Sequence, residues 1–512
     1  MLEDFALIGK IYTRFSPLRE AGGIVVRNGK IDFTGSQEEV RKRARELGME
    51  IIDRRGYTII PGFIDSHMHL SSLGLSLMTL DLRGTKSIEE LKSKMKDFIE
   101  RGGKKAVLGR GWDQELFSEG RWPRASDIDE VAGDLPAVLV RVCGHAAVLN
   151  SAALELLLES GVQDSLLQKD ELGRPTGVVF EDAVGKALSL ISEGIDRKEM
   201  LKLASFEAAR LGVTSVGFMS AKQSDLEALK EMKDFEELKT RVFLYLDHRE
   251  LSGASSQPLR GKEGFVEVRG VKLFADGSFG ARTALLSEPY ADDPKTRGVA
   301  VMGREELSSW IGRAAEMGMQ AAVHAIGDGA LDAVLSAFKM AGIGGDLGRV
   351  EHASLVRPDQ LAILSSLGIG VAVQPHFVIS DWWLVKRLGR ERARFAYPFK
   401  TLLSSGIRVG FSTDSPVEPL DPFLTVDAAV NRGKNEGIEL FEVTKHERLS
   451  TEEALHCYTK GSASLLREES IGTLEEGKKA DFIVLDRDPL RAEDLKSVKV
   501  VETFLQGRKV YP

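Results

Sequence analysis

The feature of this sequence that most constrains its fold is a regular alternation of short apolar stretches with longer amphipathic ones. The short stretches predict strands near residues 59–65, 214–218, 241–247, 268–275, 319–324, 348–352, 369–374 and 407–413. The longer stretches predict helices over residues 197–211, 224–238, 304–317, 328–341, 358–366 and 385–404. This alternation favours an α/β fold, a (β/α)8 TIM barrel. A doubly wound open sheet is the alternative, but no Gly-x-Gly-x-x-Gly opens a helix after a strand, so its dinucleotide-binding version has no support.

One long segment does not fit a plain barrel. Residues 82–195 exceed what one strand-to-helix connection needs. They contain a helix that opens with a capping box at Ser87 and Glu90, and two further strands near residues 106–108 and 137–142. We therefore expect a large inserted subdomain after the first barrel strand.

The two ends of the chain have a different pattern from the middle. Residues 1–57 and 466–512 show strand signals, including a hairpin signal at Asn28-Gly29, where both residues tolerate positive φ. We expect the two ends to pair into one small β-sandwich domain beside a barrel of residues 58–465. Two separate appendages are the alternative.

The composition argues against several classes of protein. A formal net charge of -8 and a pI of about 5.8 disfavour nucleic acid and anionic membranes as partners. The two cysteines, Cys143 and Cys457, form neither a disulfide framework nor a Cys-x-x-Cys site. The N-terminus lacks a basic leader and no apolar run reaches about 18 residues, so we expect a cytoplasmic protein. Only four Asn and ten Gln in 512 residues point to a thermophilic source.

Two histidines end the first predicted barrel strand. His67 and His69 follow the apolar run that begins near Ile59. In extended backbone, residues two apart point to the same side, so both imidazoles can face one point. Imidazole is a common ligand for zinc-like metals. The alternative is a turn that happens to hold two polar residues.

The ends of the other predicted strands also carry residues that can bind a metal. In a barrel of this kind, the carboxyl ends of the strands form the active site. The residues at these ends are His67, His69, Lys272, His324, His352 and Asp414. Neutral imidazoles leave a divalent metal its charge, so the metal can lower the pKa of bound water from about 15.7 to about 7. Asp414 can both ligate the metal and take the proton of that water, which makes it the candidate catalytic residue.

At this point the chain resembles the amidohydrolase superfamily, and within it the amidohydrolase-3 branch, which includes YtcJ-like proteins and N-substituted formamide deformylase. The resemblance covers essentially the whole chain. Its motifs are Pro-Gly-Phe-Ile-Asp-Ser-His-Met-His (61–69), Gly-Arg-Gly-Trp-Asp (109–113), Gly-His-Ala-Ala-Val-Leu-Asn-Ser (144–151), Pro-Thr-Gly (175–177), Val-Lys-Leu-Phe-Ala-Asp-Gly-Ser (271–278), Val-His-Ala-Ile-Gly-Asp (323–328), Glu-His-Ala (351–353), Ser-Thr-Asp-Ser-Pro (412–416) and Gly-Lys-Lys-Ala-Asp-Phe-Ile-Val-Leu (477–485). Together they are specific, although no one of them is specific alone.

The resemblance implies a fold and a set of roles. It implies a (β/α)8 barrel beside a β-sandwich made from both termini, with one or two divalent metals, zinc first among them. His67, His69 and Asp414 would hold one metal, and a histidine pair, His324 and His352, would hold a second. Asp414 would carry the proton from water to the leaving group. Lys272 matches the strand-4 lysine that family members carboxylate to N6-carboxylysine; an ordinary ion pair is the alternative.

The inserted segment and strand 7 offer candidates for substrate binding. Trp112 and His145, with Asn150, could form a pocket wall or lid, since an aromatic ring beside glycine-rich backbone suits a ligand. The alternative is that Trp112 belongs to the core and His145 caps a helix. Cys143 stands where relatives often carry Asp, so a shared role there is in doubt. His376 lies at the end of strand 7 and could face the site.

The leading interpretation is a metal-dependent hydrolase that cleaves a C–N bond of an amide, formamide, urea or cyclic amide in a small-molecule substrate. A mononuclear aminohydrolase that deaminates a heterocycle is the second hypothesis, and the state of Lys272 distinguishes the two. An ester or lactone hydrolase would use the same site. A barrel that binds or scaffolds without turnover is the third hypothesis, which an incomplete ligand set would favour. A homodimer is expected from the resemblance.

Overall fold

The computed structural model of the protein describes residues 4–101, 106–192, 196–251 and 264–512, and it divides into two compact units. The first unit comprises the chain up to Leu70 together with Ala204–Pro512. The second is Ser71–Leu203, which contains the predicted insertion 82–195. Among the described residues no helix is both long and apolar enough to cross a bilayer. The predicted boundary between barrel and C-terminal domain at residue 465 stays a prediction.

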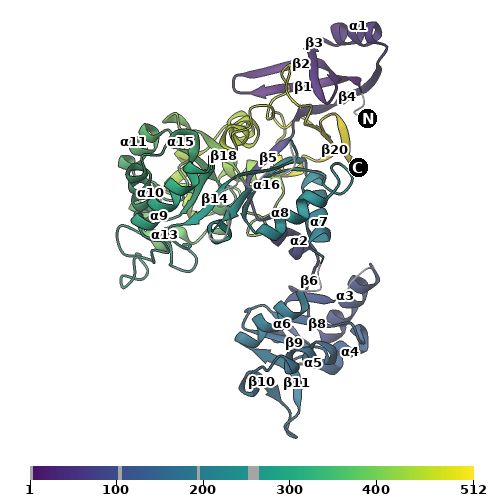
Figure 1. The fold of residues 1–512 in the computed structure, drawn as a ribbon, viewed down its shortest axis with the longest axis vertical. Coiled ribbons are helices and arrows are strands. Elements are labelled where there is room, and N and C mark those ends of the chain that lie inside the picture. The colour runs from purple at the N-terminus through teal and green to yellow at the C-terminus, as the bar shows by residue number, and fades with distance from the viewer. Residues whose placement is uncertain (1–3, 102–105, 193–195, 252–263) are drawn as a thin grey trace. The chain divides into compact units, whose positions relative to one another are not determined.

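The first unit contains eight parallel strands in the order of a barrel (Figure 1). They are β5 (Phe63–Met68), β12 (Val213–Ala221), β13 (Arg241–Asp247), β14 (Val266–Phe274), β15 (Gln320–Ala325), β16 (Gly348–His352), β17 (Gly370–Val373) and β18 (Val409–Phe411). The last strand, β18, lies beside the first, β5. Two hydrogen bonds join them: Ser66 Oγ donates to Phe411 O at 2.9 Å, and Asp414 N donates to His67 O at 2.8 Å. The predicted (β/α)8 barrel is therefore confirmed.

Helices follow most barrel strands. They are α7 (Arg197–Arg210), α8 (Gln223–Glu231), α9 (Arg304–Glu316), α10 (Asp328–Ala341) and α11 (Pro358–Leu367), with α16 (Pro422–Asn431), α17 (Glu439–Thr444), α18 (Thr451–His456) and α19 (Ser462–Leu465) after the last strand. The single helix predicted over 385–404 is wrong. It is three short helices, α13 (Leu384–Leu388), α14 (Arg390–Ala393) and α15 (Phe399–Ser404), preceded by α12 (Phe377–Ser380). Gly389 with φ of 75° and Pro398 interrupt it, because a left-handed residue and a residue without an N–H both end helical hydrogen bonding.

The two ends of the chain meet in one sheet. Its seven strands run in the order β21-β20-β19-β4-β1-β2-β3. Their bounds are β1 (Phe5–Phe15), β2 (Leu18–Arg27), β3 (Lys30–Gly35), β4 (Glu50–Pro61), β19 (Phe482–Leu485), β20 (Val500–Leu505) and β21 (Arg508–Tyr511). The two ends of the chain pair where β19 lies antiparallel to β4, as predicted. The predicted hairpin turn is also present, with Asn28 at φ 50° and Gly29 at φ 72°.

The strands of the two termini form one continuous sheet instead of the expected β-sandwich, and the contacts of β1 show what covers its two faces. Phe5 and Leu7 lie on one face and belong to an apolar cluster with Phe482 from the other end of the chain. Ala6 and Ile8 lie on the other face, where they pack against α1 (Gln37–Leu47). A helix therefore supplies the second layer that a sandwich would take from another sheet.

A single glycine separates the terminal sheet from the barrel. The strand predicted at 59–65 is split at Gly62, with β4 before it and β5 after it. A Cβ at Gly62 would lie 2.3 Å from Cγ2 of Thr214 on β12, so no side chain fits. The first barrel strand thus begins directly where the terminal sheet ends, which fixes the position of His67 and His69 near its carboxyl end.

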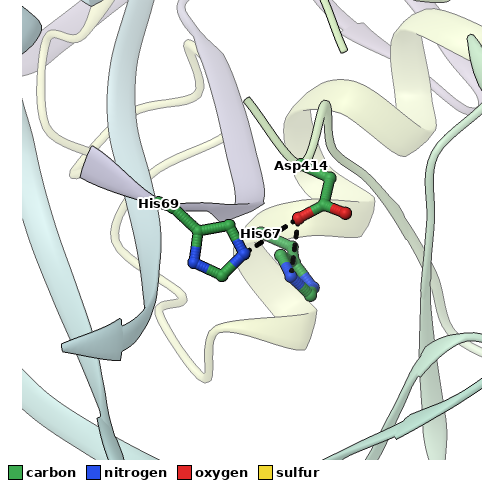
Figure 2. A group of neighbouring side chains, drawn as sticks. All are labelled: His67, His69 and Asp414. Atoms are coloured by element: carbon green, nitrogen blue, oxygen red, sulfur yellow. Dashed lines mark ion pairs between the residues drawn. The ribbon is translucent and has the colours of Figure 1, made fainter. Parts of the chain in front are cut away.

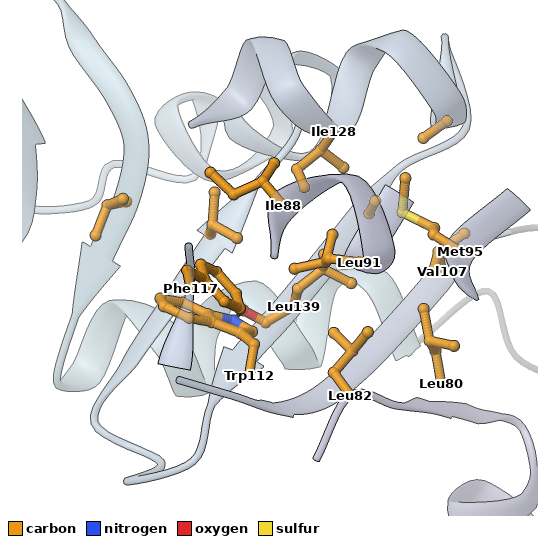
Figure 3. Close-up of a cluster of buried hydrophobic side chains, with 14 residues drawn as sticks. Leu80, Leu82, Ile88, Leu91, Met95, Val107, Trp112, Phe117, Ile128 and Leu139 are labelled. Atoms are coloured by element: carbon orange, nitrogen blue, oxygen red, sulfur yellow. Dashed lines mark hydrogen bonds between the residues drawn. The ribbon is translucent and has the colours of Figure 1, made fainter. Parts of the chain in front are cut away.

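The second unit is built on a six-stranded sheet in the order β10-β11-β9-β8-β7-β6. Its elements are α2 (Leu70–Leu77), β6 (Thr79–Asp81), α3 (Ile88–Glu100), β7 (Val107–Trp112), α4 (Ala125–Ala132), β8 (Ala137–Arg141), β9 (Ala146–Leu149), α5 (Ser151–Glu159), β10 (Leu167–Lys169), β11 (Pro175–Phe180) and α6 (Asp182–Ser192). One of its two apolar clusters gathers around Trp112, Phe117 and Leu91 (Figure 3). The unit has a core of its own.

Candidate metal centre

Two histidines and one aspartate meet at the carboxyl ends of the first and last barrel strands. His67 Nε2 lies 3.2 Å from Asp414 Oδ1, and His69 Nε2 lies 3.0 Å from the same oxygen (Figure 2). The potential ligand atoms of the three residues lie within 4.8 Å of one another. The same-side placement predicted for His67 and His69 is present, with ring centroids 5.6 Å apart.

The other ring nitrogen of each nearby histidine has an acceptor. His67 Nδ1 lies 2.5 Å from Glu351 Oε2, and His69 Nδ1 lies 3.2 Å from the carbonyl of Met219. His352 Nδ1 lies 2.8 Å from Oε1 of Gln374. An acceptor at Nδ1 fixes the proton there and leaves the Nε2 lone pair free, which is the usual arrangement of metal-binding imidazoles.

Asp414 Oδ1 gives a direct test of whether a cation fits. This oxygen is buried, and among the described residues no hydrogen bond of good geometry reaches it, although two imidazoles lie close. Burial alone would raise the pKa of Asp414, but His67 and His69 hold it well below its usual range. An ionised, buried carboxylate oxygen that faces two Nε2 lone pairs is a suitable site for a divalent metal.

His352 and His324 extend the cluster along the neighbouring strand ends. The rings of His67 and His352 are 5.0 Å apart, and those of His352 and His324 are 4.4 Å apart. His352 has φ of 71° and Ala353 has φ of 43°, so the backbone leaves the extended form at the strand end. Burial lowers the pKa of His324 to about 3 and that of His352 well below its ordinary value. Both rings are therefore neutral, as metal ligands must be.

In His324 the ring nitrogen that has an acceptor is Nε2, whereas in the other three histidines it is Nδ1. Its Nε2 lies 2.9 Å from the carbonyl of Gly277 and 3.4 Å from Asp276 Oδ1, so Nδ1 is the ring nitrogen that could act as a ligand. Asp276 accepts hydrogen bonds from the backbone N–H groups of Leu285, Ile326 and Gly327, so it holds the loops around His324.

Lys272 lies inside the same cluster. Its Nζ is 3.4 Å from His67 Nε2, and only 1% of the residue is exposed. Burial is the largest influence and lowers the pKa of Lys272 to about 8. The negative charges of Glu351 and Asp414 oppose this shift, so the buried amine is not an isolated cation.

Glu351 is a candidate functional residue that sequence reasoning missed. Its carboxylate is fully buried between His67 Nδ1 and the guanidinium of Arg349, whose Nε donates at 2.5 Å and Nη2 at 3.0 Å. Arg349 Nη2 also donates to Ser66 O at 2.6 Å. The sequence did hold one signal for Glu351. Arg349 lies two residues before it, on the same side of a buried strand, and two charged side chains buried there each need a partner.

The predicted substrate-binding residues lie in three different settings. Trp112 is fully buried in the second unit, and its Nε1 donates to Leu139 O at 2.7 Å, which supports the core alternative. His145 is exposed and lies 3.0 Å from Glu181. Asn150, not His145, caps α5, by accepting from Ala153 N at 3.1 Å.

His376 and Cys143 complete the candidates. His376 directly precedes α12, and its Nδ1 contacts Glu418 Oε2, a carboxylate that also accepts from Ser380 Oγ at 2.5 Å. Cys143 is exposed and Cys457 is buried, and both thiols are free. The substrate roles of His145 and His376 stay predictions.

Comparison with known proteins gives concordant results. The model of the family described as "Amidohydrolase family" matches residues 50–511. The chain is 33% identical over 523 residues to "Putative amidohydrolase YtcJ" of Bacillus subtilis, with 98% of each chain covered. It is 27% identical to "N-substituted formamide deformylase" of Arthrobacter pascens, over 95% of this chain and 94% of that one.

A solved structure agrees with these relatives. It is described as an uncharacterized metal-dependent hydrolase from Pyrococcus horikoshii, is 44% identical, and superposes with a TM-score of 0.84 over 97% of this chain and 99% of that one. The barrel, the His-His-Asp cluster at its strand ends and the full-length matches agree. This chain belongs to the amidohydrolase family, in its amidohydrolase-3 branch, a family of hydrolases.

Proposed function

We propose that the protein is a metal-dependent hydrolase that cleaves the C–N bond of an amide, formamide, urea or cyclic amide. The observation that carries the proposal is the convergence of His67 Nε2 and His69 Nε2 on the buried Asp414 Oδ1. The relative named for deformylation of N-substituted formamides supports a formamide or other small amide as substrate.

The metal would be held by residues from five strand ends. His67, His69 and Asp414 would hold one divalent ion, with zinc as the first candidate, and Lys272, His324 and His352 would complete a second position. When bound, the metal would supply Lewis acidity, which makes water a better nucleophile at neutral pH and polarises a carbonyl group. Glu351 would keep the Nδ1 proton on His67, so that Nε2 stays available as a ligand.

Asp414 is the residue suited to move the proton. Its depressed pKa keeps it ionised at neutral pH, so it can accept a proton from water as the oxygen bonds to the carbonyl carbon. It can then give that proton to the amide nitrogen as the C–N bond breaks. The products are a carboxylic acid and an amine, and Asp414 returns to its ionised form.

Lys272 would act as a carbamate. Its neutral Nζ would add to the carbon of CO2, a C–O π bond would become the carbamate's negative oxygen, and the amine proton would leave to water. A pKa of about 8 makes the neutral amine available near neutral pH. A carbamate at Lys272 would offer anionic oxygen donors to a metal, which an ammonium group cannot do.

Metal content and intact mass test the centre. Protein purified without chelator is expected to contain close to two metal ions per chain and to carry about 44 Da of added mass from CO2. His69→Ala should lose metal, whereas His446→Ala is the matched control, because the His446 side chain is 55% exposed and far from the cluster in sequence. Absence of metal, with none taken up on soaking, would overturn the proposal.

Amine release from a panel of N-substituted formamides and simple amides tests the reaction. The holoenzyme is expected to release amine, and Asp414→Asn is expected to lower kcat by roughly 10²–10⁴. Metal analysis of the variant separates loss of the proton carrier from loss of the ion. A variant with full metal and full activity would contradict the role of Asp414.

A single-metal deaminase is the second candidate. The three-donor group of His67, His69 and Asp414 is enough for one ion, and the second position is not needed for that chemistry. It would not need a carboxylated Lys272. One metal per chain, no added mass and ammonia release from a heterocyclic amine would favour the deaminase over the amide hydrolase.

A further inference from the structure

A column of polar side chains crosses the interior of the barrel and ends at His67. We call it the barrel column, and it consists of Gln320 on β15, Tyr245 on β13, and Arg349 and Glu351 on β16, each 0% exposed. Arg349 contacts residues of β13 and β5, which are not neighbours of β16 in the sheet. Barrels of this kind are filled mostly by branched apolar side chains. Four buried polar side chains in one column therefore need an account of what each of them bonds.

The column begins at two backbone carbonyls. Gln320 Nε2 donates to Asp346 O at 2.8 Å and to Leu465 O at 3.4 Å. Asp346 lies two residues before β16, so this end of the column is at the amino ends of the strands, away from the metal centre. A carbonyl oxygen can only accept a hydrogen bond. The amide nitrogen of Gln320 must therefore face these two oxygens, and its Oε1 must face the other way.

Tyr245 continues the column in a fixed direction. Its hydroxyl donates to Gln320 Oε1 at 2.6 Å, and Arg349 Nη1 donates to the same hydroxyl at 3.2 Å. Because Oε1 can only accept, it takes the tyrosine proton, and the hydroxyl oxygen is left to accept from the arginine. Burial raises the pKa of Tyr245, so the hydroxyl keeps this proton. The Arg349 guanidinium carbon also lies 4.9 Å from the centre of the tyrosine ring, which adds a cation–π contact.

A glycine makes the contact between the tyrosine and the glutamine possible. Tyr245 is paired with Gly270 on β14, and Gly270 is paired in turn with Gln320 on β15. A Cβ at Gly270 would lie 2.7 Å from Cδ1 of the tyrosine ring, so a side chain there would displace the ring. The pairing of β13 with β14 shifts by one residue just before this point, which places the glycine, instead of Arg269, opposite the tyrosine. The ring can therefore reach across β14.

At its other end the column holds a candidate metal ligand. Arg349 Nε and Nη2 donate to the two carboxylate oxygens of Glu351 at 2.5 and 3.0 Å, and Nη2 also donates to Ser66 O at 2.6 Å. Held in this way, Glu351 Oε2 lies 2.5 Å from His67 Nδ1. A carboxylate paired with a guanidinium is ionised and can only accept. The proton of this contact therefore lies on Nδ1, and Nε2 presents its lone pair.

We propose that Tyr245 and Gln320 are positioning residues of the metal centre. They hold Arg349 and, through it, Glu351, which keeps the proton of His67 on Nδ1 and the Nε2 lone pair free for the metal. Each hydrogen bond of the column has one possible direction, and that direction is set at the two carbonyls farthest from the metal. The inference rests on the metal centre of the proposed function.

The affinity for Zn²⁺, measured by competition with a chelator, tests the column. Tyr245→Phe keeps the ring and removes the hydroxyl, so the affinity should fall about three- to tenfold, which is the range for one net hydrogen bond. Gln320→Met removes the acceptor of the tyrosine proton and should lower the affinity similarly. Tyr12→Phe is the matched control, because Tyr12 is buried in the terminal sheet and its hydroxyl donates to Asp488 at 3.1 Å. Unchanged affinity in both column variants would overturn the inference.

A double-mutant cycle shows whether Tyr245 acts through Glu351. In Glu351→Gln the path from the tyrosine to His67 is already broken. Adding Tyr245→Phe to this variant should therefore change the affinity for Zn²⁺ by less than about twofold, the limit within which independent effects are normally measured. A tyrosine that only stabilises the fold would lower the affinity equally in both backgrounds, and that result would also overturn the inference.

Exchange of the His67 Nδ1 proton tests the column without metal. Protein with ¹⁵N-labelled histidine should show this proton in the NMR spectrum, and its signal should be absent in His67→Asn. Tyr245→Phe should speed its exchange with water by about three- to tenfold, whereas Tyr12→Phe should not. Circular dichroism checks the fold, and Gln320→Met replaces Tyr245→Phe if that variant does not fold. If the protein takes up no metal, the proposed function fails and this exchange rate decides the column. An unchanged rate in the column variant overturns the inference.

Discussion

Two arginine–carboxylate pairs are buried in the first unit, and they serve its barrel in opposite ways. Arg349 and Glu351 lie near the carboxyl ends of the strands, with neither side chain exposed. Arg241, at the start of β13, donates from Nη1 to Asp481 at 2.6 Å, with exposures of 0% and 3%. The chemistry of the two pairs is the same, and their neighbours are different.

What each carboxylate does with its second contact decides its role. Glu351 Oε2 contacts His67 Nδ1, so the Arg349–Glu351 pair acts on a candidate metal ligand. Asp481 Oδ1 accepts from the backbone N–H of Gln506, so the Arg241–Asp481 pair joins the barrel to the terminal sheet. The comparison teaches that a buried ion pair cannot be assigned to catalysis or stability from its own geometry.

Breaking the structural pair should give the largest loss of stability. Arg241→Met leaves the Asp481 carboxylate buried without a counter-charge, so the free energy of unfolding should fall by about 3–5 kcal/mol. Chemical denaturation measures the change, and the activity of the folded fraction should be unaltered. Arg304→Met is the control, because Arg304 and Glu305 form an exposed pair that contributes less than about 1 kcal/mol. Equal losses of stability in Arg241→Met and Arg304→Met would contradict a structural role for the Arg241–Asp481 pair.

Breaking the other pair should act on the metal. Glu351→Gln removes the carboxylate that orients His67, so metal affinity should fall roughly 10–100-fold, which is about 1.4–2.7 kcal/mol. Competition with a chelator measures the affinity. Arg241→Met should leave the affinity unchanged, and an equal fall in both variants would show that the two pairs are not distinct.

A double replacement sharpens the same contrast. Arg349→Met combined with Glu351→Leu leaves no unpaired charge, so much of the stability lost on breaking the pair should return. Metal affinity should stay low, because His67 Nδ1 still lacks its acceptor. Recovery of both properties would mean that the carboxylate acts through packing alone.

A partly buried acid with no ion pair to an arginine among the described residues gives a smaller, pH-dependent effect. Asp381 accepts from the Tyr397 hydroxyl at 2.5 Å, and burial raises the pKa of Asp381 from 3.8 to about 6. Between these values the folded protein holds a proton that the unfolded chain has released, so stability should fall by about 2 kcal/mol as pH rises from about 4 to about 6. Asp381→Asn should flatten this part of the unfolding profile, and an unchanged slope would contradict the assignment.

The same comparison explains how far the sequence could predict the site. Residues at strand ends were found because strand periodicity locates the ends, and barrel geometry brings them together. His67, His69 and Asp414 illustrate this directly. Glu351 was missed because it precedes a strand end and because its contact with His67, 284 positions away in the chain, forms only on folding.

Other parts of the fold depended on contacts that no local pattern reveals. Periodicity predicted one helix over 385–404, where Gly389 and Pro398 divide it into three. The strand at 59–65 looked continuous, yet the close approach of Thr214 at Gly62 divides it between two sheets. Trp112 could not be assigned to core or pocket from its neighbours in sequence, because its burial depends on a cluster assembled from five strands and two helices of the second unit.

The barrel closes through residues that are far apart in the chain, and this sets the time at which the centre can form. Asp65 and Thr413, whose side chains bond across the seam, are 348 positions apart. At a synthesis rate of about 5–20 residues per second, roughly 20–70 s pass between the emergence of His67 and that of Asp414. A metal held by His67, His69 and Asp414 together could therefore bind only after most of the chain has been synthesised.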